Sequence, residues 1–366
     1  MNKVIVIIFF FFNFNYLFAQ DSLYLHTLSV GDIDNGWGIL KKDDSNLLVF
    51  GSSANWTIFT NTEWKGFLLE LDTIGNIIKT ATAVNNNGWE GTLNSFAIGT
   101  DGSYIFTGYS SNYIIEYSSR IIGLFYKFNS FIYEKIIKDY TDFECSAHST
   151  ISTPDNGFII GGRMRYFDEI DTHLYLLKID KNGDIIWENI IDEFLYDNKV
   201  ISIVPLPNGN FLANCLVNWS AWDGVGQIAF IELTTDGDIV NKKIIPVQSY
   251  FEDIFNLIPS KDNGFLGMYK DYTINKHSTI IKLDQNYNVL WQSPDLCNNC
   301  GNGEVAELPS GDIIVAGCYL TGDSLEAQVH LTKLSPQGNI IWQRLYGGEK
   351  MTTLMPSLPT RTVLFG

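Results

Sequence analysis

The chain has 366 residues, 45% of them hydrophobic and 18% charged, which excludes a disordered chain and allows two ordinary domains or one large repeat array. Its 41 acidic residues outnumber 24 Lys and Arg, and the net charge of −17 argues against a nucleic-acid-binding protein, which needs a basic surface. The 14% aromatic content and the 31 glycines indicate an all-β protein with many turns.

Residues 1–19 have the layout of a secretory signal peptide. A short basic start precedes an unbroken apolar run from Val4 to Phe12, and a cleavage site follows Ala19. An uncleaved membrane anchor is the alternative, but two asparagines after the run shorten it below the roughly 20 residues that a membrane span needs. We therefore expect a protein that is secreted or held at the outer cell surface, with no membrane span in the mature chain, and a monomer.

Residues 20–366 are predicted to form a single domain built from repeats. Six segments share an alternating apolar pattern, and their fifth residues are separated by 57, 51, 54, 50 and 51 positions. A glycine follows four residues later in four copies, and a tryptophan follows eight residues later in three. These fifth residues are Leu71, Phe128, Ile179, Leu233, Leu283 and Leu334. A period of about 52 residues indicates a repeat architecture.

Each repeat is predicted to contain four short strands. The first two form a hairpin around a turn such as Asp101-Gly102 or Asn156-Gly157, the third is the aligned segment, and the fourth follows a short glycine turn. Four-stranded units of this length are the blades of a β-propeller. A β-solenoid is the alternative, but it needs shorter coils and no paired hairpin turns.

The two ends of the chain predict how the ring closes. Leu23–Ser29 resembles a lone fourth strand, whereas Thr352–Leu358 and Thr362–Gly366 resemble a first strand and the start of a second. Pairing the N-terminal strand with the last blade would leave no open sheet edge. This arrangement gives seven blades with an incomplete last one, and we expect truncation at the C-terminus because the chain stops within a repeat. A six-bladed ring is the alternative.

Candidate ligand-binding residues lie in the longer loops. In a meandering blade the tight turns share one face, and the second–third loops and inter-blade connections share the other. Aromatic rings outside the repeat register can stack on sugars, whose hydroxyl groups then bind amides and carboxylates. The predicted residues are Trp37, Trp56, Trp64, Trp89, Trp219, Trp222 and Asp223. The alternative is that these rings cover the core or the seams between blades.

The cysteines and histidines predict no catalytic centre. Cys297 and Cys300 lie in an inter-blade connection, where a small-loop disulfide is the expected state in an exported protein. A metal site would need a second ligand pair. The five histidines are scattered and no nucleophile elbow is present. We therefore predict no catalytic residue, no metal and no cofactor.

The repeats resemble those of a family of secreted bacterial β-propellers. The shared pattern runs here from the turn Asp155-Asn156-Gly157 through Lys178-Ile179-Asp180 to Trp187, and a copy with Trp342 ends in Tyr346-Gly347-Gly348. Such repeats are found in quinoprotein-like propellers and in cargo proteins of type IX secretion. The resemblance covers roughly residues 36 to 348 and implies an architecture and export rather than an activity.

The expected function is therefore binding. We predict an exported binding or scaffold propeller that engages an extracellular glycan or a surface protein through its long-loop face. The alternative is a carbohydrate-active hydrolase or lyase on the same fold, which needs paired carboxylates across the channel. A quinone-dependent dehydrogenase would need adjacent cysteines, which the sequence lacks. A purely structural surface protein is the third reading.

Overall fold

The fold is built of β-strands, as the composition predicts. The computed structural model describes residues 6–7, 25–26, 33–55, 63–83, 90–112, 118–127, 131–140, 143–166, 168–220, 225–250, 254–271, 277–296, 300–321 and 326–346. Within these residues we find no helix of the length and apolar character that crossing a membrane requires.

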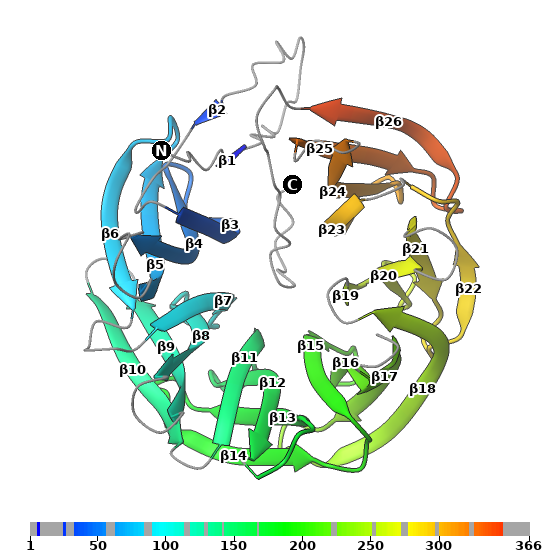
Figure 1. The fold of residues 1–366 in the computed structure, drawn as a ribbon. Helices are drawn as coiled ribbons and strands as arrows, with labels where there is room; N and C mark the ends of the chain where they lie inside the picture. The colour runs from blue at the N-terminus through cyan, green and yellow to red at the C-terminus, as the bar shows by residue number, and fades with distance from the viewer. Residues whose placement is uncertain are drawn as a thin grey trace.

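Six four-stranded antiparallel sheets stand around a ring, with the first strand of each sheet innermost (Figure 1). Blades 1 to 3 comprise β3 (Ile33–Lys41), β4 (Asn46–Asn55), β5 (Glu63–Asp72) and β6 (Ile77–Ala83); β7 (Glu90–Ile98), β8 (Tyr104–Asn112), β9 (Ser118–Lys127) and β10 (Phe131–Tyr140); β11 (Phe143–Ser152), β12 (Phe158–Tyr166), β13 (His173–Ile179) and β14 (Ile185–Ile191). Blades 4 to 6 comprise β15 (Asp197–Pro205), β16 (Phe211–Trp219), β17 (Val225–Leu233) and β18 (Ile239–Tyr250); β19 (Ile254–Pro259), β20 (Phe265–Asp271), β21 (His277–Leu283) and β22 (Val289–Gln292); β23 (Cys300–Glu307), β24 (Ile313–Thr321), β25 (Glu326–Leu334) and β26 (Ile340–Tyr346).

The β-propeller prediction is confirmed, and the described part of the chain contains six blades, the number that the alternative gives. The prediction of a seventh blade depends on pairing three terminal segments of the chain. Of the N-terminal one, Leu25–His26 (β2) pairs with Val6–Ile7 (β1) as a separate two-stranded sheet rather than with the last blade. The two C-terminal segments, within residues 352–366, lie outside the described residues. The boundaries 1–19 and 20–366 stay predictions.

The tight turns follow the sequence prediction, with one refinement. In the third–fourth turns, Asp180 Oδ1 accepts hydrogen bonds from the backbone N–H groups of Asn182 and Asp184, both at 2.8 Å, and Gly183 takes a φ of 82°. In the first–second turn Asn156-Gly157, the asparagine takes the positive φ of 65°. Gly157 is instead required by space, because a Cβ there would lie 2.6 Å from the carbonyl oxygen of Ile179.

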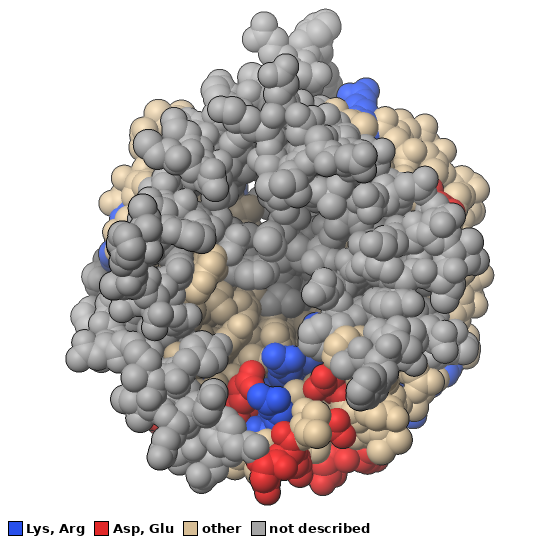
Figure 2. Space-filling model, in the orientation of Figure 1, with Lys and Arg blue, Asp and Glu red and all other residues tan. Residues whose placement is uncertain are grey.

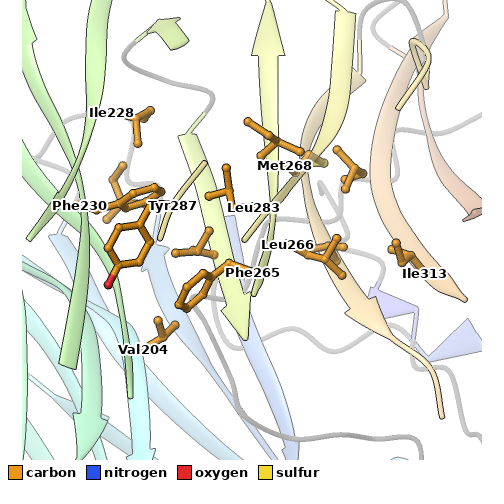
Figure 3. Close-up of a cluster of buried hydrophobic side chains, with 14 of the residues drawn as sticks. Val204, Ile228, Phe230, Phe265, Leu266, Met268, Leu283, Tyr287 and Ile313 are labelled. Atoms are coloured by element: carbon orange, nitrogen blue, oxygen red, sulfur yellow. The ribbon is translucent and has the colours of Figure 1, made fainter. Parts of the chain in front are cut away.

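The hydrophobic core lies in layers between neighbouring blades. The third strand β13 is buried along its whole length, whereas the fourth strand β14 at the rim is mostly half-buried. Between blades 4 and 5 (Figure 3), the ring of Tyr287 packs on Phe230 and Phe265 at centroid distances of 5.1 and 5.6 Å. This packing explains why a tyrosine, at a φ of 63°, replaces the turn glycine that four other copies have.

The repeated tryptophans of the fourth strands join neighbouring blades. Trp187 of blade 3 donates a hydrogen bond of 3.0 Å to the carbonyl of Thr235 in blade 4, and its ring lies where a side chain at Gly237 would be. Trp291 of blade 5 covers Gly338 of blade 6 in the same way. These residues belong to the framework of the ring.

Stability is expected to fall as the pH drops below about 4, the usual pKa region of aspartate. Partial burial of Asp155 and Asp262 opposes their ionisation, but the hydrogen bonds and positive charges of Lys178 and Lys282, together with hydrogen bonds from neighbouring turn residues, outweigh it in sum and lower the pKa of both carboxyls. A carboxyl whose pKa is lowered in the folded state makes its full contribution to the free energy of unfolding at a pH above its unfolded pKa. That contribution is lost as the pH falls through the pKa of the folded state. Urea unfolding midpoints should therefore drop from pH 6 to pH 3, and drop less in the variant with Asp155→Asn and Asp262→Asn. An equal drop in both proteins would contradict this account.

Candidate functional site

The structure describes three of the seven predicted binding residues in some part. Trp64 is the second residue of β5 and Trp219 is the last of β16, so both half-buried rings stand at strand ends on the long-loop face. Trp37 lies within β3, where the structure describes the backbone only. Trp56, Trp89, Trp222 and Asp223 lie outside the described residues. The structure therefore places Trp64 and Trp219 on the predicted face, in blades 1 and 4, and does not bring them together.

The end of blade 4 on the long-loop face has aromatic side chains and a backbone with positive φ at two non-glycine residues. Trp219 pairs across the sheet with Asp197 and packs against the hydrophobic cluster between blades 4 and 5. Tyr196, directly before Asp197, has a φ of 59° and a 47% exposed side chain, and Asn218 has a φ of 56°. Positive φ is rare for such residues and persists where the surroundings impose it, commonly at functional sites.

A buried network of amides imposes this backbone. Asn198, which is 1% exposed, donates from Nδ2 to the carbonyls of Thr172 and Tyr196, both at 2.7 Å. Its Oδ1 accepts from the backbone N–H of Asn218 at 2.9 Å. Asn218 in turn donates to Gln227 at 2.8 Å and accepts from the N–H of Leu195 at 3.0 Å. Fully satisfied networks of this kind hold a surface rigid.

The innermost strands of blades 1 to 4 each contain a β-bulge at the same place. In β11, Ala147 pairs with Gly162 and Ser149 with Gly161, so His148 is the extra residue. The registers of β3, β7 and β15 shift in the same way, and their extra residues are Trp37, Asn94 and Ile201. Bulges re-aim side chains and are frequent beside active sites.

These bulged residues differ in what they do. Asn94 donates a hydrogen bond of 2.9 Å to the carbonyl of Ala147, which joins blade 2 to blade 3, and Ile201 is buried in the core. His148 instead forms a hydrogen bond of 2.8 Å between Nε2 and the hydroxyl of Ser146. Among the described bulge side chains, only His148 is ionisable.

Charged residues surround His148 at the loop end of blade 3. Cross-strand pairing places Ser146 opposite Arg163 and Glu144 opposite Arg165, so these four side chains share one face of the blade, the face toward blade 4. Arg165 Nη2 lies 2.5 Å from Glu144, and Arg163 Nη2 lies 3.8 Å from the same carboxylate. Figure 2 shows basic and acidic side chains together at the inner end of blades 3 and 4, where the face is hollowed toward the ring centre.

Electrostatics keep His148 neutral. Loss of solvent around the imidazole, followed by the positive charges of Lys199 on β15 and Arg163 on β12, holds the pKa of His148 well below its usual value. At neutral pH the ring is therefore an uncharged imidazole that can donate or accept a hydrogen bond. We call the group formed by Glu144, Ser146, His148, Arg163, Arg165 and Lys199 the channel cluster.

The sequence reasoning missed the channel cluster. It treated the histidines as scattered, and the cluster joins three strands from two blades. The signal that could have found it is the glycine recurring in the second strand (Gly51, Gly108 and Gly162) opposite three of the four bulges. Among the described residues, no group of three or more His, Cys, Asp or Glu side chains is placed to hold a metal ion.

The cysteines contribute framework positions where they are described. Cys145 and Cys215 are buried thiols in β11 and β16, and burial raises the pKa of both, to about 12 for Cys145. Ser119 of blade 2 bonds to the backbone of Cys145 in blade 3. Cys297 lies outside the described residues, and of Cys300 only the backbone is described, so their disulfide stays a prediction.

Comparison with known proteins finds likeness in fold only. No family model and no curated protein matches the sequence. Among solved structures, a polysaccharide lyase described as an ulvan lyase of a new family, PL25, aligns with a TM-score of 0.56 and 10% identity over 84% of this chain and 79% of that one. A protein of unknown function from Dyadobacter fermentans DSM 18053 aligns with a TM-score of 0.50 and 9% identity over 69% and 81%.

A puromycin hydrolase aligns with a TM-score of 0.50 and 12% identity over 83% of this chain, but the chain spans only 46% of that protein. At these identities the three likenesses show the propeller architecture and say nothing of an activity.

Proposed function

We propose that the protein is an exported binding propeller that holds a glycan on the long-loop face of blades 3 and 4. The observation that carries the proposal is the loop end of blade 4. There a half-buried Trp219 stands beside an exposed Tyr196 on backbone that buried amides fix. A rigid aromatic surface costs little conformational entropy on binding, and its ring faces suit the apolar faces of sugars.

The surroundings of this aromatic end suit a hydroxyl-rich ligand. Asp197 and the channel cluster supply charged donors and acceptors within the same two blades. The signal-like segment 1–19 supports the part of the proposal that the ligand lies outside the cell. A surface protein is the other ligand class that the same face would accept, and a glycan array separates the two.

The second candidate function is a carbohydrate-active enzyme, a hydrolase or a lyase. The specific observation that favours it is the neutral His148, hydrogen-bonded to Ser146 and flanked by two cationic residues. A neutral imidazole can take a proton in general base catalysis. The fold likeness to a protein described as a polysaccharide lyase is consistent with this candidate but does not carry it.

Replacing Trp219 with alanine is expected to weaken glycan binding about tenfold or more, because a central aromatic residue commonly supplies over 1.4 kcal/mol of binding. The measurement is a glycan array with the chain from residue 20 onward, followed by calorimetry on the strongest ligand. Trp342→Ala, which removes an aromatic ring from the outer strand β26, is the matched control and should bind normally.

Wild-type protein that binds no glycan on the array would overturn the proposal, and capture of a defined surface protein in its place would favour the other ligand class. If a bound polysaccharide is shortened by the wild-type protein and not by His148→Ala, the enzyme replaces the binding protein as the function. Thermal melting of each variant shows whether the fold persists.

A further inference from the structure

The two most exposed large hydrophobic side chains in the described part of the chain lie in loops on the long-loop face of blades 3 and 4. Ile170, between β12 and β13, is 88% exposed, and Leu195, between β14 and β15, is 67% exposed. One exposed hydrophobic side chain is ordinary on a protein surface, whereas a group of them on adjacent segments marks an interaction site. We call residues 168–171 and 192–195 the loop-tip surface.

Hydrogen bonds join the two loops. Thr172 Oγ1 donates to the carbonyl oxygen of Asn198 and accepts from the N–H of the same residue, both at 2.8 Å. Ile170 stands two residues before Thr172, and Leu195 stands three residues before Asn198. Even an extended chain would therefore keep the two tips within about 7 and 11 Å of this contact. One partner can touch both tips.

Each loop is also anchored to its own blade. In the first, Glu169 Oε2 lies 2.5 Å from Nε2 of His173, which is buried at the start of β13. In the second, the N–H of Leu195 donates a hydrogen bond of 3.0 Å to Asn218, and Phe194 packs against the hydrophobic cluster between blades 3 and 4. A surface that is already ordered loses little conformational entropy when it binds a partner.

Carboxylates flank both hydrophobic tips. Asp168 and Asp171 stand on either side of the first tip, and Asp192 precedes the second. These three side chains make no ion pair or side-chain hydrogen bond within the part of the chain that the structure describes. Glu193 differs, because Lys242 Nζ lies 2.5 Å from its carboxylate. Three carboxylates of the loop-tip surface are thus available to the charged groups of a partner.

The charge at this end of blades 3 and 4 is negative when every described charged side chain is counted. The five carboxylates of the loop-tip surface are joined by those of Glu144 and Asp197. The cationic side chains are Arg163, Arg165, Lys199 and Lys242. Figure 2 shows acidic side chains gathered over the same two blades. This excess of carboxylates, in a chain of net charge −17, favours a positively charged partner.

We propose that the loop-tip surface is a docking site for a basic polypeptide segment, one that carries Lys or Arg beside apolar side chains. The aliphatic tips Ile170 and Leu195 suit such apolar side chains, whereas stacking on a sugar is a property of aromatic rings. The flanking carboxylates suit ammonium and guanidinium groups and repel anionic lipids and nucleic acids. The inference goes beyond the proposed function, because Trp219 and Tyr196 are not part of this surface.

The test is fluorescence anisotropy with labelled peptides of defined sequence. One peptide repeats Lys-Lys-Leu-Leu, so that both faces of the extended chain present both residue types. Glu replaces Lys in the second peptide, and Ser replaces Leu in the third. Wild-type protein should bind the Lys-Leu peptide about tenfold or more tightly than either of the others, because only this peptide matches both the tips and the carboxylates. Raising the ionic strength from about 0.1 M to about 1 M shortens the Debye length from about 10 Å to about 3 Å and should weaken the binding.

A pair of double variants tests the apolar contribution. Ile170→Ser with Leu195→Ser should weaken binding of the Lys-Leu peptide about tenfold or more, because the apolar area buried against its leucines is lost. Ile74→Ser with Leu290→Ser is the matched control, since these side chains are also exposed but belong to blades 1 and 5. The control should bind the peptide like wild type.

A second pair of double variants tests the carboxylates. Asp168→Asn with Asp192→Asn should weaken binding about threefold and reduce its dependence on salt, because exposed ion pairs contribute little individually. Asp236→Asn with Asp238→Asn removes the same charge from exposed positions in the third–fourth turn of blade 4, on the opposite face. This control should bind like wild type, and thermal melting shows whether each variant keeps its fold.

A measurement on wild-type protein keeps the proposal open to refutation even if a variant fails to fold. The imidazole NMR signals of His173, which contacts Glu169 of the surface, should shift when the Lys-Leu peptide is added, whereas those of His330 in blade 6 should not. Equal binding of the three peptides, or undiminished binding by both loop-tip double variants, would overturn the docking site. Binding to phosphatidylglycerol vesicles that Ile170→Ser with Leu195→Ser abolishes would also overturn it. Failure of the proposed function is distinguishable, since the protein would then bind the peptide and no glycan.

Discussion

Alanine at position 162 is expected to destabilise the protein by about 3 kcal/mol, at the upper end of the range for adding a methyl group to a packed interior. A Cβ on Gly162 would lie 1.7 Å from the carbonyl oxygen of Ser146 and 2.8 Å from its carbonyl carbon. Both atoms belong to the backbone of the bulged strand β11, so no side-chain rotation relieves the clash. The bulge would have to flatten, and His148 would then lose its orientation. Equilibrium urea unfolding measures the change.

Gly209→Ala separates this effect from simple backbone strain. Gly209 has a φ of 87°, but a Cβ there would have nothing within 4 Å, so alanine should cost only the roughly 1–2 kcal/mol of the left-handed conformation. Gly108→Ala in blade 2 should behave like Gly162→Ala, because its Cβ would lie 1.8 Å from the carbonyl oxygen of Thr92. Equal and small losses for Gly162→Ala and Gly209→Ala would show that the bulge is not sterically defined.

The ring could be predicted from sequence because the same physical requirement is repeated in every copy. A strand buried on both faces needs a near-continuous apolar segment, and the aligned third strands such as β13 meet that requirement. A tight turn needs a residue that tolerates positive φ, and Gly183 and Asn156 meet it. Blade number was less certain, because it depends on how the terminal segments pair, and no repeated pattern constrains them.

The candidate site was only half predictable. Trp64 and Trp219 could be assigned to the long-loop face since they lie at strand ends, where the face is fixed by the order of strands. The channel cluster could not be found by counting alternate residues, because the bulge at His148 shifts the pattern by one position. Lys199 joins the cluster only through the packing of blade 4 on blade 3, which one strand's sequence does not contain.

The ion pairs on the turn face give the second large expected effect. Lys178 is 3% exposed, and its ammonium lies 2.6 Å from Asp155 Oδ2 and 3.2 Å from the carbonyl oxygen of Thr235 in blade 4. Asp155→Ala should cost about 2 kcal/mol, less than the roughly 3–5 kcal/mol of a fully buried pair because the Asp155 side chain is half exposed. The cost arises because the buried ammonium loses its carboxylate partner.

Lys178→Met should cost less than Asp155→Ala, since the aspartate left behind can be solvated while methionine preserves the apolar stem. In blade 1 the two charges are exchanged: the carboxylate, Glu70, is on the third strand and the lysine, Lys42, is in the first turn. Lys42 Nζ donates a hydrogen bond of 2.7 Å to Glu70 Oε1. Lys42 occupies the turn position that Thr153 holds in blade 3, so the double variant with Thr153→Lys and Lys178→Glu should be less destabilised than Lys178→Glu alone. Urea unfolding of the two single variants measures the asymmetry, and a larger loss in Lys178→Met would show that the buried charge itself stabilises the seam between blades 3 and 4.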